Sequence, residues 1–129
     1  MTCADETSDY LRRARQSLSA AELLWREGYP SEATSRAYYA MFYAAQGLLR
    51  SEGVAVVKHS AVVSKFGELF ARTRRMDPAL HRMLIEAKEA RELADYVMDR
   101  EATAGSVEVR LAGAKAFLEA VEGQVGGTQ

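Results

Sequence analysis

The sequence has 129 residues, the size of one ordinary domain, and 48% of them are hydrophobic, so the chain can bury a core. Its single cysteine, Cys3, excludes an internal disulfide, and no apolar run is long enough to cross a bilayer. The acidic, polar start MTCADETSD is unlike a signal peptide, so a cytoplasmic protein is expected.

Helical spacing of apolar residues predicts an all-α fold with five helices, in a single domain over residues 1–129 with a core at about 8–125. The first helix is expected from Ser8 to Glu27. The second is expected to begin near Pro30, which is tolerated in a first turn because its missing N–H has no intrahelical partner there. It is expected to end before Gly53.

Three further helices are expected in the second half of the chain. His59 and Ser60 open the third. Asp77 followed by Pro78 is typical of an N-cap and a first helical residue, and so predicts the start of the fourth helix. Ser106 is the expected cap of the fifth.

Successive amphipathic helices with short connections favour an antiparallel bundle of four to five helices. The second helix carries a stripe of small residues that would let another helix approach closely, either at the centre of the bundle or at a dimer interface. These residues are Ala33, Ala37, Ala40, Ala44 and Gly47.

The second helix also carries a polar face within the sequence SRAYYAMFYAAQGLL. Arg36, Tyr39 and Tyr43 are spaced i, i+3 and i+7, so they share one side of the helix, and Gln46 continues it. Two interpretations are open. The tyrosines could bury their rings while Arg36 pairs with a carboxylate. Alternatively, this face could form one wall of a binding site.

The fourth helix contains ARELADYVMD, in which Arg91 lies on or beside the apolar stripe. A buried guanidinium needs an anion, because an unpaired buried charge is costly. Asp95 at i+4 is the obvious partner, although arginine before aspartate is the less favoured order. The alternative is a guanidinium aimed at a phosphate, with Tyr96 beside it.

The start of the third helix offers free N–H groups and the positive end of the helix dipole, which suit an anion. Ser60 could equally be only an N-cap, and His59 an ordinary surface residue. The segment from Lys58 to Arg82 has six basic and two acidic residues, a net charge of +4 in a chain of net charge −1. It could attract phosphates or be a solvated charge run.

Other chemistries are not indicated. The two histidines, His59 and His81, have no metal-like spacing, so no zinc site is expected. The sequence has neither a glycine-rich phosphate loop before a lysine nor a serine in a GxSxG turn. No cofactor is expected.

Three blocks of the sequence resemble small prokaryotic HEPN-domain proteins and occur in the same order: SRAYYAMFYAA, KHSAVVSKFGELF and RELADY. The resemblance covers roughly Leu11 to Phe117. It implies a four- or five-helix antiparallel bundle that usually dimerises. It also implies a place in a toxin–antitoxin or defence module, often beside a separately encoded nucleotidyltransferase.

Active members of that family cut RNA without a metal, using an arginine followed after four to six residues by a histidine. The arginine stabilises the phosphate, and the histidine assists attack by the ribose 2′-hydroxyl. In this sequence the allowed positions after Arg91 are Tyr96, Val97 and Met98, and none is histidine.

The resemblance therefore favours a module that binds a nucleotide, RNA or a partner nucleotidyltransferase. The binding residues would be Arg36, Tyr39, Tyr43, His59, Ser60, Arg91 and Asp95. The alternative is a metal-independent endoribonuclease toxin whose catalytic residues are Arg91 with Tyr96 or His59. Arg75 and His81 also match the family spacing, but an intervening proline breaks that stretch at a helix start. A third interpretation is a scaffold whose tyrosines hold a dimer together.

Overall fold

The computed structural model describes residues 2–96 and 104–126, and within these ranges every regular element is helical. The helices are α1 (Cys3–Arg26), α2 (Pro30–Ser51), α3 (His59–Phe66), α4 (Pro78–Tyr96) and α5 (Ala104–Gly126). A π-helical turn, η1 (Gly67–Ala71), continues α3. The predicted all-α fold with five helices is confirmed.

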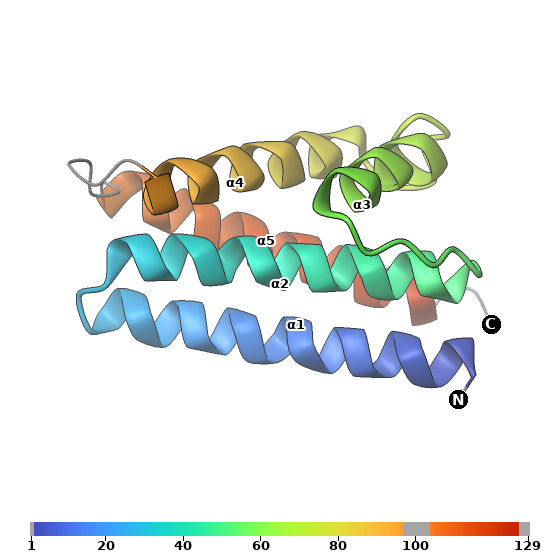
Figure 1. The fold of residues 1–129 in the computed structure, drawn as a ribbon, viewed down its shortest axis with the longest axis horizontal. Coiled ribbons are helices and arrows are strands. Elements are labelled where there is room, and N and C mark those ends of the chain that lie inside the picture. The colour runs from blue at the N-terminus through green and yellow to red at the C-terminus, as the bar shows by residue number, and fades with distance from the viewer. Residues whose placement is uncertain (1, 97–103, 127–129) are drawn as a thin grey trace.

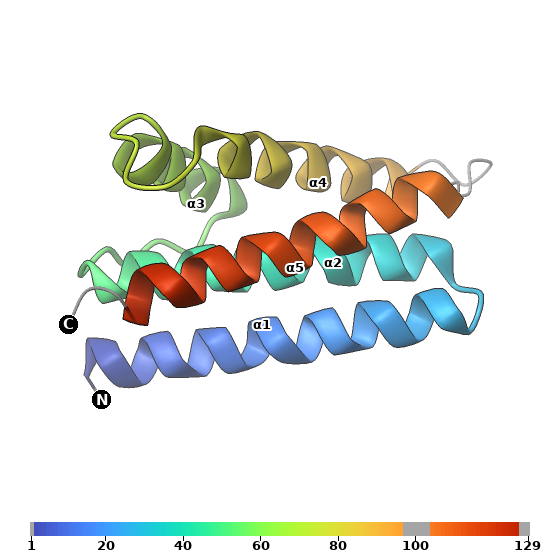
Figure 2. The ribbon, with the colours of Figure 1, turned by 180° about the vertical axis from the view of Figure 1, so that it is seen from behind.

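The four long helices form an antiparallel bundle around α2 (Figure 1). Helices α1 and α2 lie side by side as a hairpin, and α5 lies behind α2 in this view and in front of it in Figure 2. Helices α1 and α4 run in one direction, and α2 and α5 in the other. No helix formed by residues 2–96 or 104–126 is long and apolar enough to span a membrane.

The stripe of small residues on α2 lies at the centre of the bundle, because every member of it is buried within this one chain. At Gly47 the neighbouring helix is so close that an added Cβ would lie 3.1 Å from Tyr10 Cβ and 3.3 Å from the carbonyl oxygen of Thr7. The Thr7 hydroxyl also donates a hydrogen bond of 2.9 Å to the Gly47 carbonyl. Of the two interpretations of the stripe, packing at the bundle centre is therefore the one that the structure supports.

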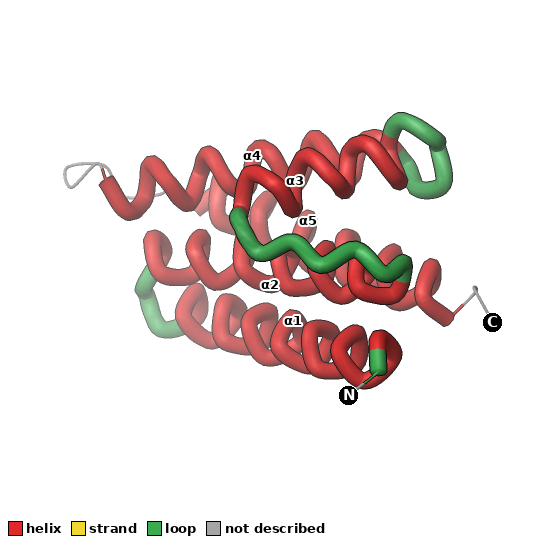
Figure 3. Tube along the Cα trace, turned by 45° about the vertical axis from the view of Figure 1, so that its right-hand side comes forward, coloured by secondary structure: helices red, strands yellow, loops and turns green. Residues whose placement is uncertain are grey.

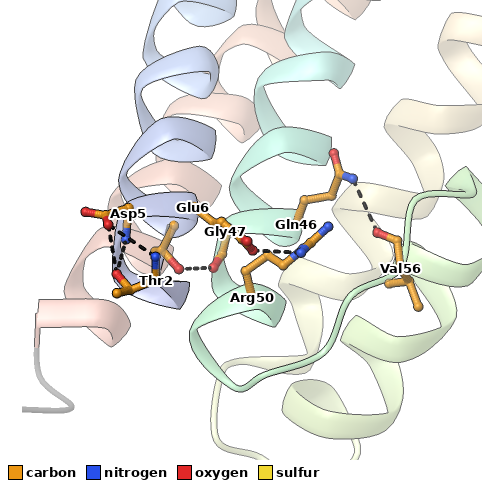
Figure 4. Close-up of polar contacts among 8 residues, drawn as sticks. Thr2, Asp5, Glu6, Gln46, Gly47, Arg50 and Val56 are labelled. Atoms are coloured by element: carbon orange, nitrogen blue, oxygen red, sulfur yellow. Dashed lines mark hydrogen bonds and ion pairs between the residues drawn. The ribbon is translucent and has the colours of Figure 1, made fainter.

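Polar contacts secure the open end of this hairpin, where the start of α1 lies beside the end of α2 (Figure 4). Thr2 and Asp5 form a capping box, which explains why α1 begins earlier than predicted. Arg50 Nη1 lies 2.7 Å from Glu6 Oε2. Gln46, only 5% exposed, donates from Nε2 to the carbonyl of Val56 at 3.3 Å, so it holds the following loop and not the predicted polar face.

The loop after α2 runs back along that helix before α3 begins (Figure 3). The N-cap of α3 is Lys58, whose backbone is extended, so Ser60 already lies inside the helix and is not the N-cap. Ser106 likewise lies inside α5, which begins at Ala104. The predicted start of α4 is confirmed, because Asp77 Oδ1 accepts a hydrogen bond of 2.9 Å from the backbone N–H of Ala79.

Gly67, the first residue of the π-helical turn, makes room for His81 on α4 because it has no side chain. An added Cβ at Gly67 would lie 2.5 Å from Cε1 of the His81 ring. That ring donates from Nε2 to the carbonyl of Val63 at 3.0 Å. Arg75 Nη1 lies 2.7 Å from Glu52 Oε1, and its guanidinium lies over the Phe70 ring. Arg75 and His81, the other arginine–histidine pair at the family spacing, therefore both contribute to the stability of the fold.

Candidate functional site

Two arginines from different helices lie against one tyrosine ring. Tyr39 projects from α2, and the Cζ atom of Arg36, one turn earlier, lies 4.6 Å from its ring centroid. Arg91, on α4, places its Cζ atom 5.4 Å from the same centroid. Both distances are within the range of cation–π attraction. The structure thus brings together the α2 polar face and the Arg91 turn, two of the predicted parts of the site.

Arg36 has no carboxylate partner among the residues that the structure describes. The interpretation that Arg36 pairs with a carboxylate is therefore wrong for residues 2–96 and 104–126. Its guanidinium lies over the ring of Tyr39 instead. An aromatic ring offsets a positive charge only in part, so Arg36 can still bind an anion.

Arg91 does lie beside Asp95, as the i+4 spacing predicts. Its Nε is 3.0 Å from Asp95 Oδ2. This nitrogen is shielded from solvent, yet its N–H is not directed at the carboxylate and makes no hydrogen bond within the described structure. The attraction is therefore ionic without a well-formed hydrogen bond. Ser35 donates to Asp95 Oδ1 at 3.2 Å, which ties the carboxylate to α2 as well.

His59 is half-buried against aromatic rings, so the interpretation as an ordinary surface residue is wrong. Its ring stacks on Phe42 with centroids 4.2 Å apart, and its Nδ1 lies 2.9 Å from the hydroxyl oxygen of Tyr38. Tyr38 is fully buried, and burial raises the pKa of its hydroxyl, so this group stays protonated and donates. Neutral His59 therefore accepts at Nδ1 and carries its hydrogen on Nε2.

The fold places His59 and Arg91 near the same aromatic ring. The ring centroid of Tyr39 lies 5.7 Å from that of His59 and 5.4 Å from Arg91 Cζ. Desolvation lowers the pKa of His59, and the positive charges of Arg91 and Lys88 lower it further, opposed by Glu92. His59 is therefore neutral near pH 7 in the folded protein.

The lowered pKa of His59 predicts a loss of stability in acid. The folded protein disfavours protonated His59, so this contribution to stability is complete above the unfolded pKa, about 6.5, and is lost as the pH falls through the lower folded pKa. Urea denaturation at pH 7.5 and at pH 5 is expected to show a larger fall in unfolding free energy for wild type than for His59→Gln. Equal falls in the two proteins would contradict this assignment.

A groove of about 490 Å³ borders this cluster between α2 and α4, and it is lined by Leu24, Ser31, Glu32, Ser35, Arg36, Ala94 and Asp95. Tyr43 is half-exposed, and it lines a second hollow together with Arg36. Residues 2–96 and 104–126 gather no three side chains that could hold a metal ion.

Some predicted site residues are not brought into the cluster. Ser60 is exposed and makes no side-chain hydrogen bond or ion pair to the other residues of the site in the described structure. Tyr96 ends α4, and its side chain lies outside the described residues, as do Val97 and Met98.

Sequence reasoning did not assign a site role to three neighbours of this cluster, namely Ser35, Tyr38 and Phe42. Tyr38 and Phe42 are spaced four residues apart on α2, a pattern that is typical of a core face. Their contact with His59 joins two helices. The one sequence signal for this contact is an aromatic-rich helix followed by a histidine at the start of the next helix.

The geometry defines an all-helical bundle with an arginine–tyrosine site between α2 and α4. Comparison with known families matches residues 7–124 to the HEPN domain. The chain therefore belongs to the HEPN domain family, which confirms the predicted resemblance.

Several curated proteins are similar to this chain. A UPF0332 protein of Gloeobacter violaceus is 41% identical over 91 residues, which cover 70% of this chain and 72% of the relative. A UPF0332 protein of Thermotoga maritima is 33% identical over 111 residues, 86% of this chain and 84% of the relative. A protein of Methanocaldococcus jannaschii named "Putative toxin" is 35% identical over 91 residues, 70% of this chain and 62% of the relative.

Proposed function

We propose that this HEPN domain binds RNA or a nucleotide through its phosphate at the α2–α4 site, as the binding module of a toxin–antitoxin or defence system. The observation that carries the proposal is the convergence of Arg36 and Arg91 on the Tyr39 ring, with Arg36 lacking a carboxylate partner in the described structure. Guanidinium groups recognise phosphate oxygens with paired, charge-assisted hydrogen bonds.

The other members of the site have complementary roles in this proposal. Tyr43, half-exposed beside Arg36, offers a ring on which a base can stack. Asp95 holds Arg91 in place and competes with an incoming phosphate for it. His59, neutral and packed against Phe42, forms the wall of the site next to Arg91.

The family and its relatives support the proposed setting of this module. Two similar proteins of Methanocaldococcus jannaschii carry the printed name "Putative toxin", which supports a toxin-like role for this chain. A homodimer and a separately encoded nucleotidyltransferase partner belong to the same proposal, and they rest on the resemblance of the sequence to HEPN proteins.

A second candidate is metal-independent RNA cleavage, and the specific observation in its favour is that His59 and Arg91 both lie near the Tyr39 ring. A neutral histidine beside an arginine is the pair that such cleavage uses. Here, however, His59 Nδ1 already accepts from Tyr38, and Nε2 carries the hydrogen. His59 would have to change tautomer before acting as a base, so binding without cleavage is the favoured function.

One experiment separates the two candidates. Fluorescently labelled eight-nucleotide RNA is mixed with the purified protein in EDTA, and anisotropy and a denaturing gel are recorded on the same samples. We expect saturable binding that weakens with salt, with intact RNA throughout. Cleavage that Arg91→Ala abolishes would establish the nuclease instead. The absence of binding to RNA and to free nucleotides by a folded protein would refute both.

A further inference from the structure

Two more hollows continue the α2–α4 groove along the seam between α1 and α2. The middle hollow, about 350 Å³, is lined by Arg13, Gln16, Ser17, Ala20, Arg36 and Tyr43. The distal hollow, about 280 Å³, is lined by Glu6, Asp9, Tyr10, Arg13 and Arg50. Arg36 lines both the groove and the middle hollow, and Arg13 lines both the middle and the distal hollow. The three depressions therefore lie in a row, and each neighbouring pair shares one arginine.

The charges along this line are mixed, because the α2–α4 groove also contains Glu32 and Asp95, and unpaired cations are concentrated in the middle hollow. The middle hollow contains two arginines and no acid. Neither Arg13 nor Arg36 forms an ion pair with another described residue. The acids of the distal hollow already have partners, because Glu6 pairs with Arg50 at 2.7 Å and Asp9 pairs with Arg12 at 3.1 Å.

Tyrosines accompany the arginines along the same line. Arg13 and Arg50 place their Cζ atoms 5.8 and 5.9 Å from the ring centroid of Tyr10. Tyr10 thus repeats, at the far end of the seam, the arrangement of two guanidiniums that surrounds Tyr39. Tyr43 lies between these two rings in the middle hollow. Alternating cations and aromatic rings are the features that hold single-stranded nucleic acid without regard to sequence.

The register of the two helices produces this line. Arg36, Tyr43 and Arg50 recur every seven residues on α2, which keeps them on one face of the helix. Tyr10, Arg13 and Ser17 share a face of α1 at spacings of three and four residues. Since α1 and α2 are antiparallel and closely packed, the two faces stay together along the seam (Figure 1).

We propose that the three hollows form one binding track for a single-stranded polynucleotide, which runs from the α2–α4 site to the first turns of α1. This inference rests on the proposed function, because the α2–α4 site is one end of the track. Arg36 and Arg50 are separated by about 21 Å at a rise of about 1.5 Å per residue. That length corresponds to roughly six phosphates at a spacing of about 3.4 Å along a stacked strand.

The test compares short and long oligonucleotides with Arg13→Ala. Labelled oligouridines of two and eight nucleotides are titrated by anisotropy at several salt concentrations. For wild type, the longer strand is expected to bind at least tenfold more tightly. Arg13→Ala is expected to weaken the eight-nucleotide strand about fivefold, and to reduce the salt slope by about 0.7 for each phosphate that the variant no longer neutralises. It is expected to leave binding of the two-nucleotide strand unchanged.

Lys115→Ala is the matched control, because Lys115 is an exposed helical cation on α5 and lines none of the three hollows. Thermal melts confirm that both variants are folded. If Arg13→Ala behaves like Lys115→Ala while Arg36→Ala still weakens binding, the track is refuted and the α2–α4 site stands. If wild type binds neither oligouridine, the track is refuted as well, and nucleotide binding by the α2–α4 site is then judged with free nucleotides. An eight-nucleotide oligodeoxythymidine shows whether the track distinguishes RNA from DNA.

Discussion

The double variant Arg36→Ala and Arg91→Ala lacks both guanidiniums that lie beside the Tyr39 ring. It is expected to bind eight-nucleotide RNA about 100-fold more weakly. Each arginine can supply a charge-assisted hydrogen bond to phosphate, which contributes roughly 1.5–3 kcal/mol, or about tenfold in Kd for each 1.4 kcal/mol. Each single substitution is therefore expected to weaken binding about tenfold. The measurement is fluorescence anisotropy at fixed ionic strength, since electrostatic affinities change steeply with salt.

Asp95→Asn provides a control in which the affinity for RNA is expected to rise and not to fall. Asp95 is the carboxylate that lies 3.0 Å from Arg91 Nε, so its neutralisation removes a competitor of the phosphate. This variant is expected to bind RNA more tightly, by about twofold, if roughly half of a surface ion-pair energy of up to about 1 kcal/mol is released. Arg82→Ala, which removes an exposed charge elsewhere on α4, is expected to change the Kd little. Equal losses in Arg82→Ala and Arg36→Ala would contradict a specific site.

Tyr38→Ala is expected to destabilise the folded protein by about 3–5 kcal/mol, as large aromatic-to-alanine changes in cores do. Tyr38 is among the largest fully buried side chains and lies against Phe42, Tyr39 and His59. Tyr38→Phe keeps the ring and removes only the hydroxyl that donates to His59 Nδ1 at 2.9 Å. This second variant is expected to cost about 0.5–1.5 kcal/mol, the net contribution of a typical hydrogen bond, because His59 is only half-buried. Urea denaturation measures both values.

Tyr29→Ala is the matched control for Tyr38, because Tyr29 is 53% exposed at the turn between α1 and α2. A surface substitution of this kind is expected to change the unfolding free energy by about 0.5 kcal/mol or less. A Tyr38→Ala variant within about 1 kcal/mol of wild type would show that the α2 core relaxes around the lost ring, since the cost of such cavities depends on that relaxation.

Sequence reasoning located the helices well, because their signals are local. Apolar periodicity predicted all five helices. Asp77 and Pro78 predicted the start of α4, and the structure contains the expected capping hydrogen bond of Asp77. The i+4 pair of Arg91 and Asp95 was predicted for the same reason, since both residues belong to one helix. The predicted caps Ser60 and Ser106 were wrong, because the residues just before each serine already belong to the helix.

The site residues also divide into those that local spacing could predict and those that only the tertiary structure brings together. Spacing along one helix determined that Arg36, Tyr39 and Tyr43 share a face of α2, because that depends only on the helical repeat. The tertiary structure decided everything that joins two helices: Arg91 against Tyr39, Asp95 against Ser35, and His59 against Phe42. It also decided that Gln46 turns inward to the loop carbonyl of Val56. Such contacts depend on how the helices rotate and pack about one another, and packing follows the summed fit of many side chains that no local pattern contains.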